Sequence, residues 1–251
     1  MTSNKKTWSR FYISVILVGF FIWSLFGLLP DQLLHLNILE SQGGETVLIT
    51  TPANQKILIN GGEKTKVLEE LGKELNFFEN TIDLLILTNP QESFVEGLVE
   101  VVKRYTVKKV LLTGINYPNE VYEEFLKLLD ENQIPLEIAQ GNKDYQLEKN
   151  IYLDILHPLE SIAGKKLKPS QSVVITKLTY GETSALLVGN ITKEISLKQL
   201  QTDLDLSADL LVIDPQKASP DFLAAVNARQ ILTSTEAGKL ISNGREWQEA
   251  R

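Results

Sequence analysis

The pattern of apolar and polar positions divides the chain into an apolar N-terminal stretch and a longer part in which short strands alternate with amphipathic helices. Within Lys64–Leu75, the apolar residues Val67, Leu68 and Leu71 recur at helical spacing, which predicts a helix with one buried face. The predicted helices are Lys64–Leu75, Phe94–Tyr105, Glu120–Asn132, Ile195–Leu200 and Asp221–Val226.

The strands are shorter than the helices and are separated by residues typical of turns. The segment Ile82–Thr88 is almost continuously apolar, which is typical of a strand buried on both faces. The other predicted strands are Leu34–Leu39, Thr46–Thr50, Lys56–Ile59, Val107–Leu112, Pro135–Ala139, Ile151–Ile155, Val173–Tyr180, Ser184–Val188 and Leu210–Ile213, with a strand-like tail through Trp247. This alternation of strands and helices predicts an α/β fold.

An uncharged apolar run of 19 residues, Phe11–Leu29, ends at Pro30. As a helix it would be about 28 Å long, close to the thickness of the hydrocarbon core of a bilayer. A buried core helix is one alternative, but the run is apolar on every face. A cleavable signal peptide is another, but the end of the run lacks the small residues of a cleavage site. We therefore predict an uncleaved transmembrane signal anchor at residues 11–30.

Flanking charge predicts the orientation of this anchor. Lys5, Lys6 and Arg10 precede the apolar run, whereas residues 31–50 contain no Lys or Arg. Since positive flanks stay on the cytoplasmic side, residues 1–10 are expected to form a basic cytoplasmic tail. Residues 31–251 would then form one extracytoplasmic domain of a single-pass protein of the cell membrane.

Composition excludes several kinds of chemistry. Without cysteine the chain has no disulfide, no thiolate metal site and no cysteine nucleophile. Its only histidines, His35 and His157, are expected at the surface or an interface. Beyond residue 30 the chain has 22 Lys and Arg against 32 Asp and Glu, a net charge of −10. Such an acidic body is a poor electrostatic match for nucleic acid or an anionic membrane surface.

Several sequence blocks occur in an order that resembles one known fold. ILINGG (Ile57–Gly62) and IDLLILTNP (Ile82–Pro90) are the first two. They are followed by VKKVLLTGINYP (Val107–Pro118), YLDILHPLES (Tyr152–Ser161), TKLTYGETSALLVGN (Thr176–Asn190) and SADLLVIDPQKASPDFLAAV (Ser207–Val226). Together they resemble the metallo-β-lactamase fold, and more narrowly the ComEC-like C-terminal domain of competence proteins for DNA uptake. The resemblance implies a four-layer αββα sandwich over residues 31–251, with nucleic acid as a partner on this basis alone.

The same comparison implies a degenerate metal site. Active members bind two zinc ions through a His-x-His-x-Asp-His loop, a bridging aspartate and a late histidine loop, and the aspartate of an Asp-Gly-Gly turn lies behind these ligands without binding zinc. The positions of this chain that correspond to these elements are Asn60, Asn89, Gln91, Ser93, Phe94, Asn190 and Asp214. Zinc needs imidazole, thiolate or carboxylate ligands, and neutral amides are weak replacements. We therefore predict that zinc is lost and that no other cofactor takes its place.

Two functions remain open. The first is a catalytically inactive domain with a binding or assembly role, linked through the resemblance to DNA uptake or the cell envelope. The second is a divergent metal-dependent hydrolase or phosphodiesterase that uses the carboxylates of Glu92, Glu96 and Asp214. The bound partner and any self-association are not predicted. For Phe94 we expect the ring to fill the former metal cleft, with packing at the helix start as the alternative.

Overall fold

The computed structural model describes residues 8, 12–20, 31–41, 45–76, 78–141, 143–233 and 237–250. The chain forms two compact units, Met1–Gln32 and Leu33–Arg251. In the first unit, residues 12–20 are helical and exposed. Most of the predicted anchor at residues 11–30, and of the predicted tail at residues 1–10, lies outside the described residues. Within the described part of the chain, no helix is both long and apolar enough to cross a membrane.

The second unit begins with a sheet of eight strands in the order β16-β15-β1-β2-β3-β5-β7-β8. These strands are β1 (Leu34–Ile38), β2 (Val47–Thr50), β3 (Lys56–Ile59), β5 (Leu84–Leu87), β7 (Val110–Leu112), β8 (Leu136–Ile138), β15 (Gly238–Ser242) and β16 (Trp247–Glu249). Strands β3, β5, β7 and β8 are parallel, and parallel neighbours need crossover connections. The crossovers carry α2 (Lys66–Glu74), α3 (Glu92–Arg104) and α4 (Glu120–Glu131), and β4 (Thr81–Ile82) pairs with β6 (Thr106–Val107) beside them.

A second sheet of six strands has the order β14-β13-β12-β11-β10-β9. Its strands are β9 (Asp144–Glu148), β10 (Ile151–His157), β11 (Ile175–Tyr180), β12 (Thr183–Leu187), β13 (Leu210–Ile213) and β14 (Gln230–Thr233). Strands β12, β13 and β14 are parallel and are connected through α5 (Lys193–Gln199) and α6 (Pro220–Val226). Two short 3-10 helices, η1 (Pro169–Gln171) and η2 (Pro215–Lys217), lie in the connections.

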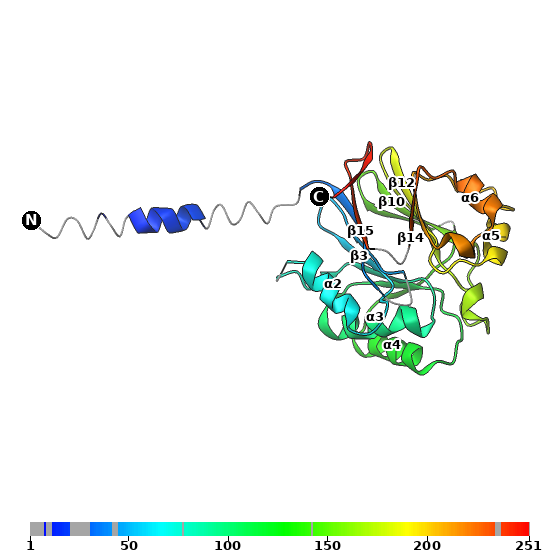
Figure 1. Cartoon of the computed structure of the whole chain (residues 1–251). Coiled ribbons are helices and arrows are strands. Elements are labelled where there is room, and N and C mark those ends of the chain that lie inside the picture. The colour runs from blue at the N-terminus through cyan, green and yellow to red at the C-terminus, as the bar shows by residue number, and fades with distance from the viewer. Residues whose placement is uncertain are drawn as a thin grey trace, which may run out of the picture. The chain divides into compact units, whose positions relative to one another are not determined.

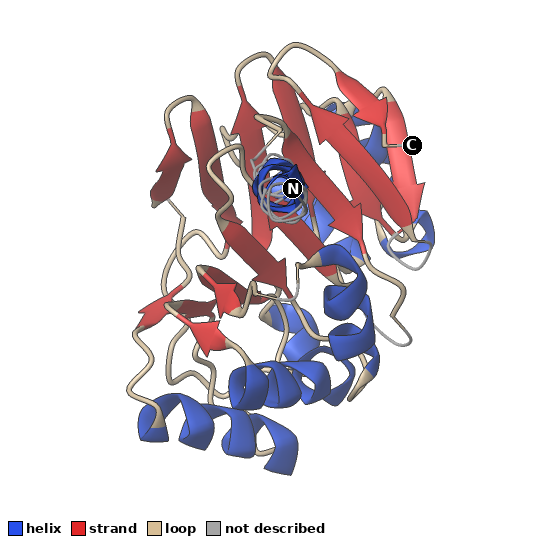
Figure 2. Ribbon diagram, turned by 90° about the vertical axis from the view of Figure 1, so that its left-hand side faces the viewer, coloured by secondary structure: helices blue, strands red, loops and turns tan. Residues whose placement is uncertain are grey.

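Side chains that alternate along the strands build three apolar layers. In β2, Val47 and Ile49 face the core between the two sheets, whereas Leu48 faces the core beneath α2, α3 and α4. In β12, Leu187 faces the core between the sheets and Leu186 faces the core beneath α5 and α6. The order is therefore helices, sheet, sheet, helices, as Figures 1 and 2 show. The predicted α/β sandwich is confirmed at this level.

The structure corrects several predicted boundaries. The predicted strand Ile82–Thr88 is divided at Asp83, whose carboxylate accepts hydrogen bonds from Lys56 N at 2.8 Å and Lys108 Nζ at 2.6 Å. Val107–Leu112 is likewise divided into β6 and β7. Two strands, β9 and β14, were not predicted; both are edge strands of the six-stranded sheet, and edge strands need no continuous apolar pattern.

Candidate functional site

Four of the predicted site positions directly follow strands at the same end of the sandwich. Asn60 follows β3 and Asn89 comes two residues after β5, in the eight-stranded sheet. In the six-stranded sheet Asn190 lies just beyond β12 and Asp214 follows β13. Because ligands of α/β proteins bind at the carboxyl ends of parallel strands, this end is the expected place for a site.

Asn60 connects its own turn after β3 with the segments that contain Glu45 and Thr88, at this end of the sandwich. Its side chain is fully buried, Nδ2 donates to the Glu45 carbonyl at 2.9 Å, and Oδ1 accepts from Thr88 N at 2.8 Å and Thr88 Oγ1 at 3.0 Å. Its φ of 58° lies in the left-handed region that asparagine tolerates better than most residues. Asn60 is therefore a structural cross-link with no free polar atom for a ligand.

A chain of amides continues from Asn60 toward the second sheet. The buried Asn89 donates through Nδ2 to the Pro169 carbonyl at 3.0 Å and accepts through Oδ1 from Gln91 N at 3.0 Å. Gln91 Oε1 in turn accepts from Asn190 Nδ2 at 3.1 Å. The structure thus brings Asn60, Asn89, Gln91 and Asn190 close together: Gln91 and Asn190 bond to each other through their side chains, whereas Asn60 and Asn89 bond to Thr88 and to the backbone.

Phe94 is 3 % exposed and packs in the apolar layer beneath α2, α3 and α4. The ring belongs to the core of the helical layer, which favours packing at the helix start over filling of a cleft. The helix start also contacts the turn after β3 through backbone: Gly61 N donates to the Phe94 carbonyl at 2.9 Å. A Cβ on Gly97 would lie 2.0 Å from the Gly61 carbonyl oxygen, so this close approach requires glycine. Ser93 is partly buried in the first turn of α3.

The carboxylates of the hydrolase alternative are held by local partners. Asp214 Oδ1 accepts from Gln216 N at 3.1 Å, and Oδ2 lies 3.7 Å from Lys217 Nζ. Glu96 lies 3.8 Å from Lys64 Nζ, and Glu92 is exposed at the start of α3. Among the described residues, no three His, Asp or Glu side chains are grouped closely enough to hold a metal ion.

The amide set does not fit the zinc ions that the family resemblance implies. A dication must be compensated by anionic or imidazole ligands when it leaves water, and the predicted positions supply neutral amides, a hydroxyl, a phenyl ring and one carboxylate, Asp214, which already interacts with Gln216 N and Lys217. The amide oxygens of Asn60, Asn89 and Gln91 already accept hydrogen bonds. Loss of zinc stays a prediction, now with a structural reason.

Glu45 is a buried acid at this end of the sandwich that the sequence did not single out. Its side chain is 3 % exposed, and neither carboxyl oxygen has a hydrogen-bond partner among the described residues. Burial raises the pKa of Glu45 to about 8, and the positive charge of Lys217 and the Gly189 N–H offset only part of the increase. A single acidic residue beside two glycines gives no sequence signal for such burial.

The histidines lie in different sheets, His35 in β1 and His157 in β10. His157 is partly buried at the end of β10, where burial lowers its pKa to about 4 and Gln199 Nε2 lies 3.0 Å from Nδ1; its place at the surface or an interface stays a prediction. An amide nitrogen can only donate, so this contact requires neutral Nδ1. His35 is half-buried within its strand.

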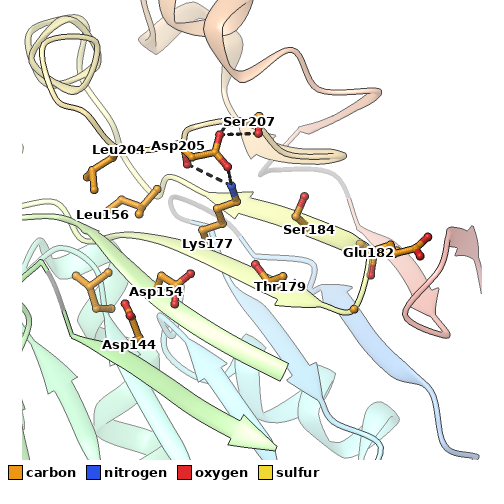
Figure 3. Close-up of a pocket in the computed structure, with 13 residues that line it drawn as sticks. Asp144, Asp154, Leu156, Lys177, Thr179, Glu182, Ser184, Leu204, Asp205 and Ser207 are labelled. Atoms are coloured by element: carbon orange, nitrogen blue, oxygen red, sulfur yellow. Dashed lines mark hydrogen bonds and ion pairs between the residues drawn. The ribbon is translucent and has the colours of Figure 1, made fainter. Parts of the chain in front are cut away.

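A groove of about 630 Å³ lies on the outer face of the six-stranded sheet (Figure 3). The strand register places Asp154 opposite Asp144 on one side and opposite Lys177 on the other. Burial and the neighbouring carboxylate of Asp144 raise the pKa of Asp154. The rest of the lining combines hydroxyl groups with the carboxylates of Glu182 and Asp205. The sequence did not indicate this groove, because it depends on pairing with the unpredicted strand β9.

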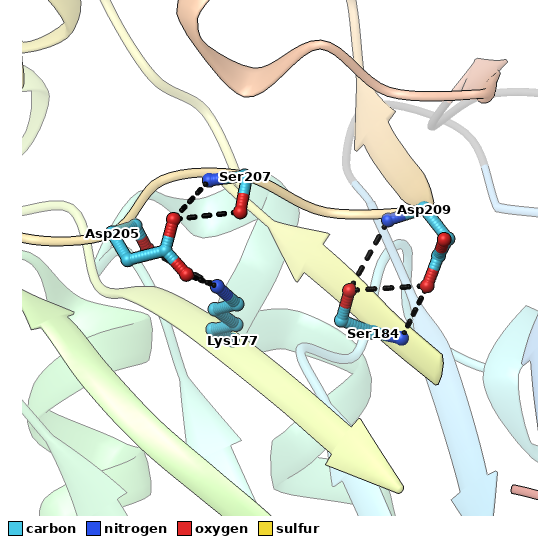
Figure 4. Close-up of polar contacts among 5 residues, drawn as sticks. All are labelled: Lys177, Ser184, Asp205, Ser207 and Asp209. Carbon is cyan, nitrogen blue, oxygen red and sulfur yellow. Dashed lines mark hydrogen bonds and ion pairs between the residues drawn. The ribbon is translucent and has the colours of Figure 1, made fainter. Parts of the chain in front are cut away.

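Two short polar networks include residues that line this groove, and Figure 4 shows their contacts. Asp205 accepts from Lys177 Nζ at 2.7 Å and from Ser207 Oγ at 2.6 Å, and these bonds lower its pKa to about 2. Beside it, Asp209 Oδ2 accepts from Ser184 N at 2.9 Å. Because Lys177 is bound to Asp205, the pair Asp144 and Asp154 has no cation bonded to it in the described part of the chain.

Comparison with solved structures identifies the fold. The chain is similar to the metallo-β-lactamase fold protein YhfI from Bacillus subtilis, with a TM-score of 0.52 and 12% identity over 80% of this chain and 86% of that protein. It has the metallo-β-lactamase fold. A mutant of the β-hydroxylase CmlA from Streptomyces venezuelae gives a TM-score of 0.51 and 12% identity over 81% of this chain, which spans 46% of that longer protein.

The sequence itself matches no model of a known protein family and no curated protein. At 12% identity, the similarity to YhfI and CmlA shows a shared architecture and carries no information on activity. The prediction of the metallo-β-lactamase fold is confirmed. The ComEC-like relationship and the degenerate site stay predictions.

Proposed function

We propose that this chain is a catalytically inactive, ComEC-like metallo-β-lactamase-fold domain that acts by binding. The observation that carries the proposal is the contact between Gln91 and Asn190, at 3.1 Å, where active relatives would have zinc ligands on both sides. A pair of amides that bond to each other keeps the end of the sandwich closed without a metal. It also provides neither a nucleophile nor a group to lower the pKa of a water molecule.

The membrane anchor and the outward orientation belong to the same proposal. They rest on the charge-free run at residues 11–29 and on the cations before it. In the helical residues 12–20, large apolar side chains such as Ile16 and Phe20 are more than half exposed, which suits a segment whose surroundings are apolar.

The binding partner is proposed from charge. The groove with Asp144, Asp154 and Glu182 lies on a body with a net charge of −10, so this face would repel the phosphates of nucleic acid. A role in DNA uptake or in the cell envelope, which rests on the resemblance alone, would therefore involve contacts with another protein rather than with DNA at this groove.

The second candidate is the divergent hydrolase with Glu92, Glu96 and Asp214. An assay of phosphodiester hydrolysis separates the two functions, using the full chain in detergent with Zn²⁺, Mn²⁺ or Mg²⁺ added in turn. The matched control replaces the three carboxylates by Gln, Gln and Asn. Binding without catalysis predicts equal background rates for both proteins. Turnover by the wild type that the control lacks would establish the hydrolase.

A further inference from the structure

The buried carboxyl group of Glu45 has no role in the proposed binding function. Its oxygens are buried and have no hydrogen bond of good geometry among the described residues, although the Gly189 N–H lies near enough to lower the pKa. Such a group is unusual, because a buried charge without compensation is strongly unfavourable. The closed structure therefore holds Glu45 best in its protonated, neutral form.

Glu45 is directly coupled to the amide chain. It precedes β2, in which Val47 and Ile49 face the space between the sheets, and the period of two places Glu45 on that same face. Its carbonyl oxygen accepts from Asn60 Nδ2 at 2.9 Å, and Asn60 Oδ1 accepts from Thr88 N at 2.8 Å. A displacement of Glu45 would therefore disturb the hydrogen bonds of Asn60, and these bonds position the segment that contains Asn89 and Gln91.

The electrostatic surroundings of Glu45 are simple. From the second sheet, Lys217 of η2 acts on it through space, and Lys217 is itself 3.7 Å from Asp214. Asn60, which bonds to the Glu45 carbonyl, and Gly189, whose N–H lowers the pKa, are uncharged. The Lys217 side chain is 51% exposed and forms no ion pair with Glu45 among the described residues, and desolvation outweighs its effect on the pKa.

We propose that Glu45 is a proton-operated latch: its protonated form keeps the two sheets closed at the site, and loss of the proton opens it. An ionised Glu45 needs water or the ammonium of Lys217, and either requires the ends of the two sheets to separate. Opening would break the contact between Gln91 and Asn190 and expose the amides to a ligand. The inference goes beyond the proposed function and does not depend on whether the domain binds metal or catalyses a reaction.

The pH range over which the site opens follows from the pKa of Glu45 in the open and closed forms. In the open form Glu45 is in water, with an ordinary pKa near 4.5, whereas burial raises the pKa of the closed form to about 8. Between these values each pH unit favours the open form about tenfold, and above the higher value the effect levels off. The site is therefore closed most firmly in acid and opens progressively toward mildly alkaline pH.

Hydrogen exchange of the full chain in detergent tests this latch. The exchange rate of each amide is measured by mass spectrometry between pH 5.5 and 9 and is divided by the intrinsic exchange rate at the same pH. Protection of the Thr88 and Gln91 amides should fall about tenfold per pH unit up to about pH 7.5 and then level off. The protein with Glu45→Gln should show no such fall, and the amides of Ile175–Tyr180 in β11 should be unaffected in both. The same profile in wild type and Glu45→Gln would overturn the proposal.

A second variant keeps the test decisive if Glu45→Gln does not fold. Lys217→Met leaves the acid in place and removes the positive charge that lowers its pKa. The pH at which protection levels off should then move upward. An unchanged profile would contradict the latch, and neither variant is read out through metal content or activity, so the result is independent of the proposed function.

Discussion

Gln91 and Asn190 are 99 residues apart in the sequence, yet the Gln91 Oε1 atom accepts a hydrogen bond from Asn190 Nδ2 at 3.1 Å. One residue follows a strand of the eight-stranded sheet and the other follows a strand of the six-stranded sheet. This contact closes the end of the sandwich where the sequence comparison places a zinc site. On the proposed function, this uncharged contact between the sheets stands where the family resemblance would place a metal.

Phe94→Ala should destabilise the domain by about 3 kcal/mol or more, because it removes a buried ring and leaves a cavity beneath α2 and α3. Phe94→Leu, which keeps a branched apolar side chain, should lose clearly less. Urea unfolding of the full chain in detergent measures both. An Ala variant as stable as the wild type would mean that Phe94 is not part of the core.

Asn60→Asp introduces the residue that the resemblance places in this turn, but it should destabilise this chain by about 3 kcal/mol at neutral pH. The carboxylate could still accept from Thr88, but it cannot donate to the Glu45 carbonyl and would be a buried negative charge facing that oxygen. Asn150→Asp is the matched control, since Asn150 also has a positive φ, 65°, but is exposed. Equal melting temperatures for the two variants would contradict the role assigned to Asn60.

We predict that His157 makes the domain less stable in acid. Its pKa is lowered to about 4 in the folded protein, so folding favours the neutral form. Above the unfolded pKa of about 6.5, protonation of His157 costs the folded protein no stability. As the pH falls from 6.5 to 4, the free energy of unfolding decreases by about 3 kcal/mol. His157→Asn should remove this component, measured as the difference in free energy of unfolding between pH 7 and pH 4.5. A variant that loses as much stability in acid as the wild type would refute it.

The topology prediction concerns intact cells from which any outer barrier has been removed. Because Lys5, Lys6 and Arg10 precede the apolar run, added protease should digest the domain beyond residue 30. An epitope tag placed before residue 5 should stay protected and serves as the internal control. Protection of the domain together with loss of the tag would show the opposite orientation.

The hydrophobic pattern predicted an α/β fold, and the resemblance to the metallo-β-lactamase fold supplied the order of its layers. Apolar residues at helical spacing, such as Val67 and Leu71, lie in the core beneath the helices, and the continuous run Leu84–Leu87 is buried on both faces. The resemblance, rather than the local pattern, pointed to Asn89, Gln91 and Asn190, which the structure joins by hydrogen bonds. Their correspondence to a former metal site stays a prediction.

The features that the sequence did not reveal depend on tertiary contacts. β9 is a polar edge strand, and without it the pairing of Asp144 with Asp154 could not be foreseen. Glu45 is buried near Gly189 and Lys217, residues that follow strands of the second sheet and lie far from it in the sequence. The place of Phe94 was assigned from the family's metal loop, whereas the structure places its ring in the core beneath the helices.

Zinc content measured together with thermal stability tests the central claim most directly. The full chain, purified in detergent and exposed to zinc before dialysis, is analysed by elemental mass spectrometry and melted with and without EDTA. Amides that bond to each other should bind no zinc, so the metal content should be far below one ion per chain. The melting temperature should then be unchanged by EDTA, since no ligand of the native state is removed. Zinc near one ion per chain, with a clear fall in melting temperature on chelation, would contradict the account.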